Sequence, residues 1–221
     1  VLYRAHYHSM EVQMELTRRG IPFEIRSGIR FFEQAHIKDV TAYLRILVNP
    51  RDEIAWKRVL GLYEKIGKVT AEKVWRFVSR ISDPHAAVLT EDFKGCVPRS
   101  ATPGLCRFQE TFRALHGCES SNPSILIETI LKSGYGDLLR ERHTDAASRE
   151  DDLIQFANYS SRFPSLEDFL SELALLTGVD EESRPEEIQE ERVVLSSIHQ
   201  AKGLEWKSVL IIWCSEGMIP L

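Results

Sequence analysis

The stretch Leu195–Pro220, LSSIHQAKGLEWKSVLIIWCSEGMIP, holds two apolar runs on either side of a polar loop. The runs predict two β-strands, the second over 208–213, and the short loop between them predicts a tight turn. Gly203 lets the backbone of that turn bend sharply. A polar loop at the end of a buried strand is a common place for ligand contacts, so the loop is the first candidate site.

Residues 1–26 repeat the α/β character at the opposite end of the chain. VLYR and IPFEIR predict short strands, and the segment between them predicts a helix that ends at Gly20. From residue 28 to about 190 the apolar residues follow helical spacing instead, as in HIKDVTAYLRILV at 36–48. We therefore expect a mainly α fold, in which a helical block interrupts a partial α/β layer formed by both chain ends.

Helix starts are marked inside this block. Asp83 precedes Pro84 and Asn122 precedes Pro123, an order that suits an N-cap followed by the first helical residue. The second of these helices is predicted to end at Gly134. Ser165 and Asp168 form a capping-box-like pair. The acidic stretch 178–190 has no apolar period and is interpreted as a linker.

The charge is uneven along the 221 residues. The formal net charge is -5, but residues 1–80 hold 15 Lys and Arg against 9 Asp and Glu, a net of +6, which leaves -11 for the rest. Local potential decides whether phosphate is attracted, so the basic part can bind nucleic acid. No apolar run is long enough to span a bilayer, and the chain does not start with Met. We expect a piece of an intracellular, cytoplasmic protein.

The sequence lacks the residues for several other chemistries. The four cysteines form no CxxC pair, which favours reduced thiols and leaves zinc as the alternative. No GxxxxGK[ST] loop occurs, because Gly61 and Gly67 have five residues between them and Val69 follows Lys68. The chain is therefore not expected to hold ATP and Mg²⁺ by itself.

The segment SSIHQAKGLEWKSVLI resembles motif V of superfamily 1 DNA helicases of the UvrD/PcrA/Rep type. The family pattern is close to T-x-H-x-A-K-G-L-E-[FW]-x-x-V. Ser197 stands in the Thr position and Trp206 in the aromatic position.

Three more segments resemble this family. LYRAHYHSMEVQMELTRRGIPF and RFFEQAHIKD are similar to motif IVa (YR-x-N, G-[IM]-P-[FY]) and to its continuation (RFF-x-x-x-E-I-K-D), with His6 in the Asn position and His36 in the Glu position. We expect the change at His36 to affect the surface or the packing. EKIGKVTAEKV is similar to GIG-x-x-T, with Lys65 in the position of the first Gly. SREDDLIQF is similar to R-x-E-N-L-x-E-L, with Arg149 and Leu153 in register.

The resemblance implies a fold and an activity. Residues 1–27 and 191–221 would be parts of a RecA-like domain, 2A, and 28–190 would be the helical subdomain 2B inserted into it. The parent protein would be an ATP-dependent 3′–5′ DNA helicase that uses ATP and Mg²⁺. The chain lacks the phosphate-binding loop, the metal-holding acidic motif and the arginine motifs IV and VI, so it is expected to be inactive alone.

The resemblance also implies three sets of site residues. Arg4, Ser197, His199 and Lys202 would contact single-stranded DNA, and Lys202 could instead be a structural ion-pair partner. Gly203 and Glu205 would belong to the ATP site, where the carboxylate accepts from the ribose. A helix–turn–helix hairpin would hold duplex DNA through Lys65, Ile66, Gly67, Lys68, Thr70 and Lys73, with Thr70 as a helix cap. No catalytic and no metal-binding residue is expected.

Two alternatives stay open at this stage. The chain could be a protein-interaction or autoinhibitory module that receives repair or replication proteins, or it could belong to a helicase–nuclease. The sequence does not name the pathway, the partners or the oligomeric state.

Overall fold

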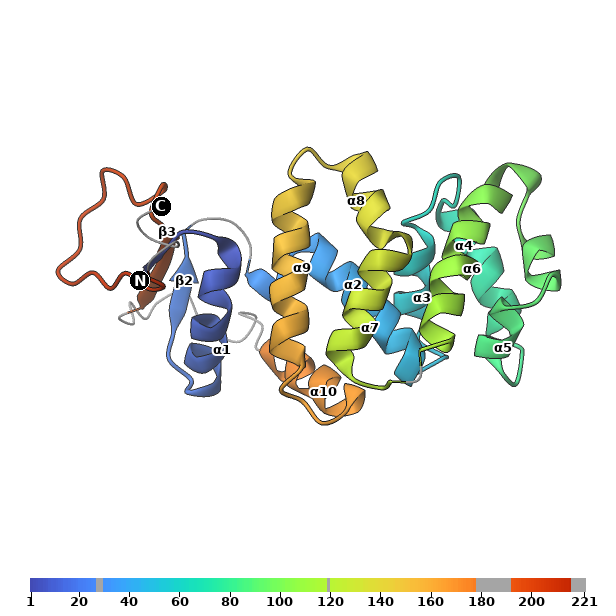
Figure 1. Cartoon of the computed structure of the whole chain (residues 1–221), viewed down its shortest axis with the longest axis horizontal. Coiled ribbons are helices and arrows are strands. Elements are labelled where there is room, and N and C mark those ends of the chain that lie inside the picture. Colours follow the sequence, from blue (N-terminus) through green and yellow to red (C-terminus); the bar gives the residue numbers. More distant parts are fainter. Residues whose placement is uncertain (27–29, 119, 178–191, 216–221) are drawn as a thin grey trace, which may run out of the picture. The chain divides into compact units, whose positions relative to one another are not determined.

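The structure is a computed structural model that describes residues 1–26, 30–118, 120–177 and 192–215 (Figure 1). The chain divides into two compact units: Val1–Gln34 with Glu172–Leu221, and Ala35–Ser171. We call them the sheet unit and the helical unit. Their identification with 2A and 2B stays a prediction. The predicted acidic linker, 178–190, lies outside the described residues.

The sheet unit joins strands from both ends of the chain. In its described residues, strands β1 (Leu2–Tyr3), β2 (Phe23–Ile25) and β3 (Val193–Ser197) form a parallel sheet in the order β1-β3-β2. Tyr3 pairs with Ser197, and Phe23 pairs with Val193. The expectation that distant chain ends share one sheet is confirmed.

Helix α1 (Met10–Arg18) connects β1 to β2, as the sequence predicts. Its buried side chains Met10 and Met14 lie in the core with Tyr3. The amide of buried Gln13 donates to Ser9 Oγ (2.7 Å), and its carbonyl accepts from the backbone N–H of Phe31 (3.1 Å). One polar side chain therefore fixes α1 to the segment that follows β2.

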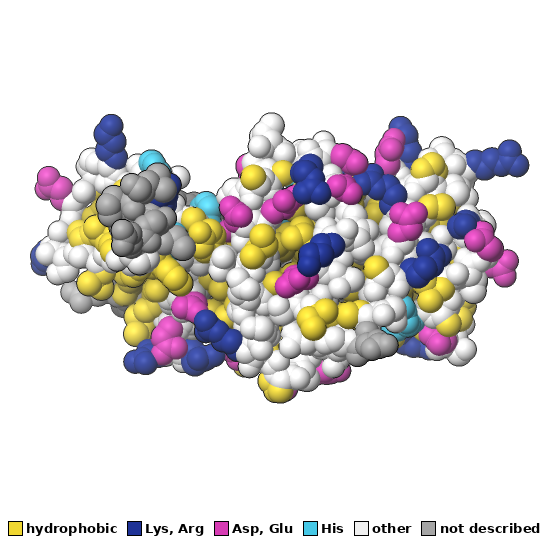
Figure 2. Space-filling view, viewed as in Figure 1, with side chains coloured by type: hydrophobic (Ala, Val, Ile, Leu, Met, Phe, Trp, Pro, Cys, Tyr) yellow, Lys and Arg dark blue, Asp and Glu magenta, His cyan; other side chains and the backbone are white. Residues whose placement is uncertain are grey.

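The predicted strand over 208–213 is wrong. The segment makes one parallel bridge, between Leu2 and Ile211. Val209, Leu210, Ile211 and Trp213 are 48%, 66%, 51% and 46% exposed, and hydrophobic side chains gather on this face of the sheet unit (Figure 2). An apolar run becomes an interior strand only when neighbours cover it, and among the described residues the backbone of this segment pairs only with the short strand β1.

The helical unit contains helices α2 to α9 and the start of α10. Helices α2 (Ala35–Val48), α3 (Glu53–Leu60), α4 (Lys68–Val78) and α5 (Pro84–Val88) come first. The others are α6 (Thr102–His116), α7 (Pro123–Ile130), α8 (Gly136–Arg142), α9 (Ala146–Ser160) and α10 (Leu166–Thr177). A 3₁₀ helix, η3 (Asp92–Cys96), lies between α5 and α6. None of the described helices is long and apolar enough to cross a membrane.

The predicted caps at Asp83, Asn122 and Ser165 are confirmed. Asp83 accepts from the backbone N–H of Ala86 (3.0 Å) and Asn122 from that of Ser124 (2.9 Å). Ser165 Oγ accepts from the N–H of Asp168 (3.1 Å) and donates to its carboxylate (2.7 Å).

The helix predicted to end at Gly134 is not uniform. Helix α7 ends at Ile130, and a π-helical turn (Leu131–Tyr135) connects it to α8, with Gly134 at φ +135°. The left-handed side of the Ramachandran map is accessible to glycine at little cost, so Gly134 permits the kink.

A buried polar network joins α2 to α3 and to the π turn. Asp39 accepts from Arg58 Nε (2.7 Å) and from the Tyr135 hydroxyl (2.9 Å). Burial and the carboxylate of Asp39 raise the pKa of Tyr135. Asp39, from the predicted RFF-x-x-x-E-I-K-D segment, therefore has a structural role.

All four cysteines lie in described residues and are free thiols. Burial, followed by the charge of Asp92, raises the pKa of Cys96.

Candidate nucleic-acid interface

The first set of predicted site residues lies where β1 and β3 end. Because Tyr3 pairs with Ser197 in a parallel register, Arg4 and the loop after Ser197 lie at the same carboxyl edge of the sheet. The N–H of Ile198 donates to the carbonyl of Tyr3 (2.9 Å) and extends the pairing into the loop. The carboxyl edge of parallel strands is where α/β proteins bind ligands.

The loop that follows β3 is a closed turn. The N–H of Gln200 donates to the carbonyl of Ser197 (3.1 Å) and also to its hydroxyl (3.3 Å), and the N–H of Ala201 donates to the same carbonyl (3.0 Å). Gly203 has φ +82°, and a Cβ there would meet no atom within 4 Å. The conformation, and not lack of space, therefore favours glycine.

Three predicted side chains project from this turn. His199, Lys202 and Glu205 are exposed, and none of them makes an ion pair or a side-chain hydrogen bond with another described residue. The structure thus shows no ion-pair role for Lys202 within the described chain. The turn offers a cation, an imidazole and a carboxylate to solvent at one strand end.

His8 packs next to this edge of the sheet and was not singled out from the sequence. His8 is buried, accepts from the N–H of Ala5 at Nδ1 (3.3 Å), and stacks on Trp213 with ring centroids 5.4 Å apart. Its Nε2 has no partner in the described residues. Burial first, and the charge of Arg4 second, lower the pKa of His8. No spacing in the sequence distinguishes it from the exposed His6.

The second set of residues forms the turn between α3 and α4. Lys65 has φ +59°, a conformation that costs a residue with a side chain about 1 kcal/mol or more. Glycine adopts it freely, which explains why the resembling pattern has glycine at this position. This chain keeps the conformation and adds a positive charge.

Helix α4 starts without a side-chain cap. Its N-cap residue is Gly67, whose carbonyl accepts the first helical bond from the N–H of Ala71 (2.9 Å). Thr70 lies inside the helix, so its predicted role as a cap is wrong. The first amide groups of an uncapped helix remain available, and the helix dipole adds positive potential there. A Cβ at Gly67 would meet nothing within 4 Å, so the space beside this N-cap residue is open.

Three lysines lie in this turn and in the first two turns of α4. Lys65, Lys68 and Lys73 are exposed, and none makes an ion pair with a described residue. Ile66 is 3% exposed, so its side chain packs in the core and is not available to contact DNA. The turn, called here the α3–α4 hairpin (residues 61–73), therefore combines free amides with three lysines that make no ion pair with a described residue. Its net charge is +1, because it also holds Glu64 and Glu72.

Gly104 holds the hairpin in place and was not singled out from the sequence. It lies in α6, and a Cβ there would be 2.4 Å from the carbonyl oxygen and 3.1 Å from the nitrogen of Glu64. Helix α6 thus contacts the hairpin backbone directly beside Lys65. A glycine near the start of a helix carries no sequence signal for such a long-range contact.

The nucleotide residues expected from the sequence are only part of a site. The exposed carboxylate of Glu205 can accept from a ribose hydroxyl. Among the described residues there is no group of three His, Cys, Asp or Glu that could hold a metal ion. The contact of Glu205 with a nucleotide stays a prediction.

Comparison of the sequence with known protein families shows the family to which the chain belongs. The UvrD-like helicase C-terminal domain family matches residues 1–91 and 136–221. The chain belongs to this family. Both predicted interfaces, at the strand ends and at the α3–α4 hairpin, lie inside the matched residues.

Curated relatives of this UvrD-like chain are longer proteins. The ATP-dependent DNA helicase PcrA of Bacillus subtilis (strain 168) is 28% identical over the whole chain, and the PcrA of Staphylococcus epidermidis (strain ATCC 35984) is 29% identical. A probable DNA helicase II homolog of Mycoplasma capricolum subsp. capricolum is 32% identical over the whole chain. The chain spans 31% of the length of each of these relatives.

Proposed function

We propose that this chain is the DNA-holding part of an ATP-dependent 3′–5′ DNA helicase, with the sheet unit as part of 2A and the helical unit as 2B. The observation that carries the proposal is the α3–α4 hairpin. It combines an uncapped helix start, open space beside Gly67 and three unpaired lysines among the described residues. The names of the relatives, which are DNA helicases, support the same class.

The hairpin is suited to a phosphate backbone. Free amides at a helix start donate to phosphate oxygens, and the dipole stabilises the negative charge. Lys65, Lys68 and Lys73 add attraction that does not depend on base sequence. Contacts of this kind position DNA without reading it. The hairpin would therefore hold duplex DNA of any sequence.

The loop that follows β3 (residues 198–205), called here the strand-end loop, would bind both single-stranded DNA and the nucleotide. Arg4, the hydroxyl of Ser197, and His199 would contact phosphates, and Glu205 would accept from the ribose of ATP. These side chains all follow the paired ends of β1 and β3. A shift of the loop when one ligand binds would therefore change the affinity for the other ligand. That is a coupling between two binding sites.

ATP turnover would belong to the parent protein, with ATP and Mg²⁺ held by segments that this sequence does not contain. The chain alone is expected to bind DNA in the cytoplasm without hydrolysing ATP or unwinding a duplex. Magnesium-dependent ATP turnover by the pure chain would contradict this part of the proposal.

The test is fluorescence anisotropy with a labelled duplex that carries a single-stranded tail, at about 50 mM salt. Lys65→Ala with Lys68→Ala should weaken binding about tenfold or more, because this variant lacks two of the cations that attract phosphate. Lys38→Ala with Lys132→Ala removes the same charge from exposed positions on α2 and in the π turn, and it should change binding less than about twofold.

A protein-interaction module is the second candidate, and one observation favours it. The residues after position 80 carry a net charge of -11, which repels DNA and suits a basic partner. Failure of the chain to bind the tailed duplex under the same low-salt conditions would favour this second candidate.

A further inference from the structure

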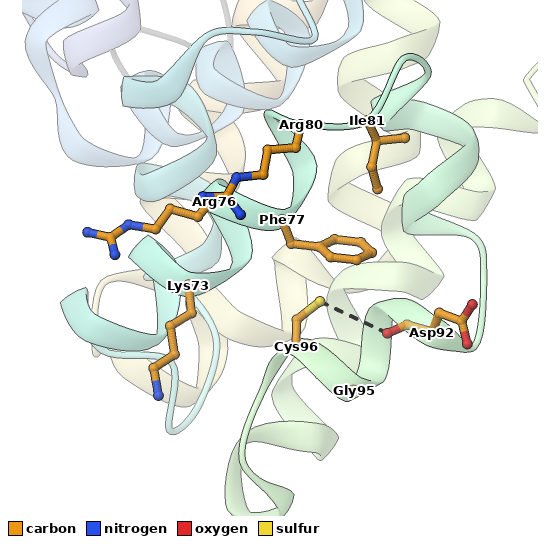
Figure 3. A pocket seen from close by; sticks show the side chains of 8 residues that line it. All are labelled: Lys73, Arg76, Phe77, Arg80, Ile81, Asp92, Gly95 and Cys96. Carbon is orange, nitrogen blue, oxygen red and sulfur yellow. Dashed lines mark hydrogen bonds between the residues drawn. The ribbon is translucent and has the colours of Figure 1, made fainter.

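The helical unit has a hollow of about 840 Å³ between the carboxyl half of α4 and η3. Lys73, Arg76, Phe77, Arg80 and Ile81 line it from the α4 side, and Asp92, Gly95 and Cys96 from η3 (Figure 3). We call it the α4 groove. No residue of the groove except Lys73 belongs to the proposed DNA contacts.

The α4 groove has a basic side and an apolar side. Its α4 residues are spaced i, i+3, i+4, i+7 and i+8, so they share one face of the helix and the turn that follows it. In Figure 3 the guanidinium groups of Arg76 and Arg80 extend to one side, and the ring of Phe77 extends to the other, where Ile81 lies. Phe77 packs on the fully buried Phe93 with ring centroids 6.3 Å apart, which holds the ring in position.

The charges of the groove are not balanced. Lys73 and Arg80 make no ion pair with a described residue, and Arg76 pairs with Glu72 at 2.8 Å on the solvent side. Asp92 is the only acid among the described residues that line the groove, against three cations. Exposed pairs such as Arg76–Glu72 are weak, so a stronger anion can recruit this arginine as well.

We propose that the α4 groove binds a short stretch of single-stranded DNA, with phosphates on Lys73, Arg76 and Arg80 and one base against Phe77. A basic groove with an aromatic platform is the arrangement by which proteins bind single strands without sequence preference. A duplex keeps its bases stacked inside, so it would leave Phe77 and Ile81 uncovered. The proposal rests on the proposed function, because it extends the DNA contacts of the hairpin.

Continuity with the hairpin favours DNA over an acidic peptide. Lys73 belongs both to the hairpin and to the groove. Helix α4 rises about 15 Å from Lys68 to its end at Val78, which is about four or five nucleotides of a stacked strand. A strand that leaves a duplex held at the hairpin would therefore enter the groove after a few nucleotides.

The test uses the 221-residue chain and a labelled oligo(dT) of about ten nucleotides, with anisotropy at about 50 mM salt. Arg80→Ala and Phe77→Leu should each weaken oligo(dT) binding about fivefold or more, whereas binding of a blunt duplex should change less than about twofold. Arg142→Ala removes an exposed arginine from α8 and is the matched control. Arg80 is exposed, so its variant keeps the test valid even if Phe77→Leu fails to fold.

A second measurement places the strand, because the strand-end loop also binds oligo(dT) under the proposed function. Saturating oligo(dT) should slow alkylation of Cys96, measured by peptide mass spectrometry, at least about threefold relative to Cys118, which follows α6 and lies outside both proposed single-strand sites.

The outcomes separate the two proposals. Unchanged oligo(dT) binding in both variants, or equal protection of Cys96 and Cys118, would overturn the groove and leave the hairpin intact. Loss of oligo(dT) binding in Arg80→Ala while the Lys65 and Lys68 variant still binds duplex normally would support the groove and overturn the hairpin. An acidic peptide that binds at Arg80 and is not displaced by oligo(dT) would assign the groove to a protein partner and overturn the proposal.

Discussion

His36 Nε2 lies 3.2 Å from Asp152 Oδ2, and both side chains are almost completely buried. Arg149 Nη1 lies 3.5 Å from His36 Nδ1. Because arginine can only donate, Nδ1 accepts and Nε2–H donates to Asp152. The UvrD-type patterns have Glu at the position of His36 and Asn at the position of Asp152. The chain has therefore exchanged the acid and the hydrogen-bond donor between α2 and α9. Of the two effects expected for the change at His36, surface or packing, the buried position supports packing.

This exchange predicts a reciprocal effect of mutation. His36→Glu alone would bury two carboxylates together and should lower the free energy of unfolding by about 3 kcal/mol. His36→Glu combined with Asp152→Asn restores one acid and one donor, so it should recover most of that free energy. Urea unfolding of the three proteins measures this. An equal decrease in the single and the double variant would show that the pair is not coupled.

Gly104→Ala tests the packing that positions the hairpin. The new Cβ would lie 2.4 Å from the Glu64 carbonyl oxygen, and since this atom is backbone the hairpin must move. We expect the free energy of unfolding to fall by about 1–3 kcal/mol and duplex DNA to bind more weakly. Gly117→Ala at the end of the same helix has its closest approach at 3.4 Å and serves as the control. Unchanged stability and binding in Gly104→Ala would refute this packing.

Lys65→Gly separates backbone strain from charge. Glycine relieves the left-handed conformation at φ +59°, and its greater freedom in the unfolded chain offsets part of the gain. The thermal midpoint should rise by the equivalent of about 0.5 kcal/mol while duplex binding weakens. Lys73→Gly, inside α4, should instead lower the stability by about 1 kcal/mol. A lower midpoint for Lys65→Gly would contradict the left-handed assignment.

His8 makes the stability of the chain depend on pH. Its folded-state pKa is lowered from the ordinary 6.5, so the unfolded chain binds more protons below that value. The stabilisation from neutral His8 is complete above about pH 6.5 and is lost as the pH falls through the folded pKa. His8→Phe keeps a ring beside Trp213 and removes the titrating group. Its urea midpoint between about pH 7 and pH 5 should fall less than that of the unmodified chain, and an equal fall would exclude His8.

Local signals in the sequence predicted much of the fold. The caps at Asp83, Asn122 and Ser165 follow from side chains that bond to amides two or three residues away, so neighbours in sequence were enough. The pairing of both chain ends followed from two incomplete α/β fragments, each unable to bury itself. The segment 208–213 was misjudged because an apolar run indicates burial only if covering elements are present.

The sequence predicts a site residue when the backbone conformation at that position favours one residue type, such as glycine at a positive φ. Gly203, at φ +82°, is of this kind. Gly104, His8 and the His36–Asp152 pair act through interactions between residues distant in sequence, for which a single sequence gives no spacing. Thr70 was predicted to cap α4, and this prediction is wrong because α4 starts at Lys68 and Thr70 lies inside the helix.

The salt dependence of duplex binding tests the central claim most directly. The slope of log K against log salt concentration becomes shallower by about 0.9 for each phosphate that the protein no longer neutralises. Comparing the chain with its Lys65→Ala, Lys68→Ala variant between about 50 and 200 mM salt should therefore give slopes that differ by about 1.8. Parallel lines for the two proteins would show that the α3–α4 hairpin does not contact DNA phosphates.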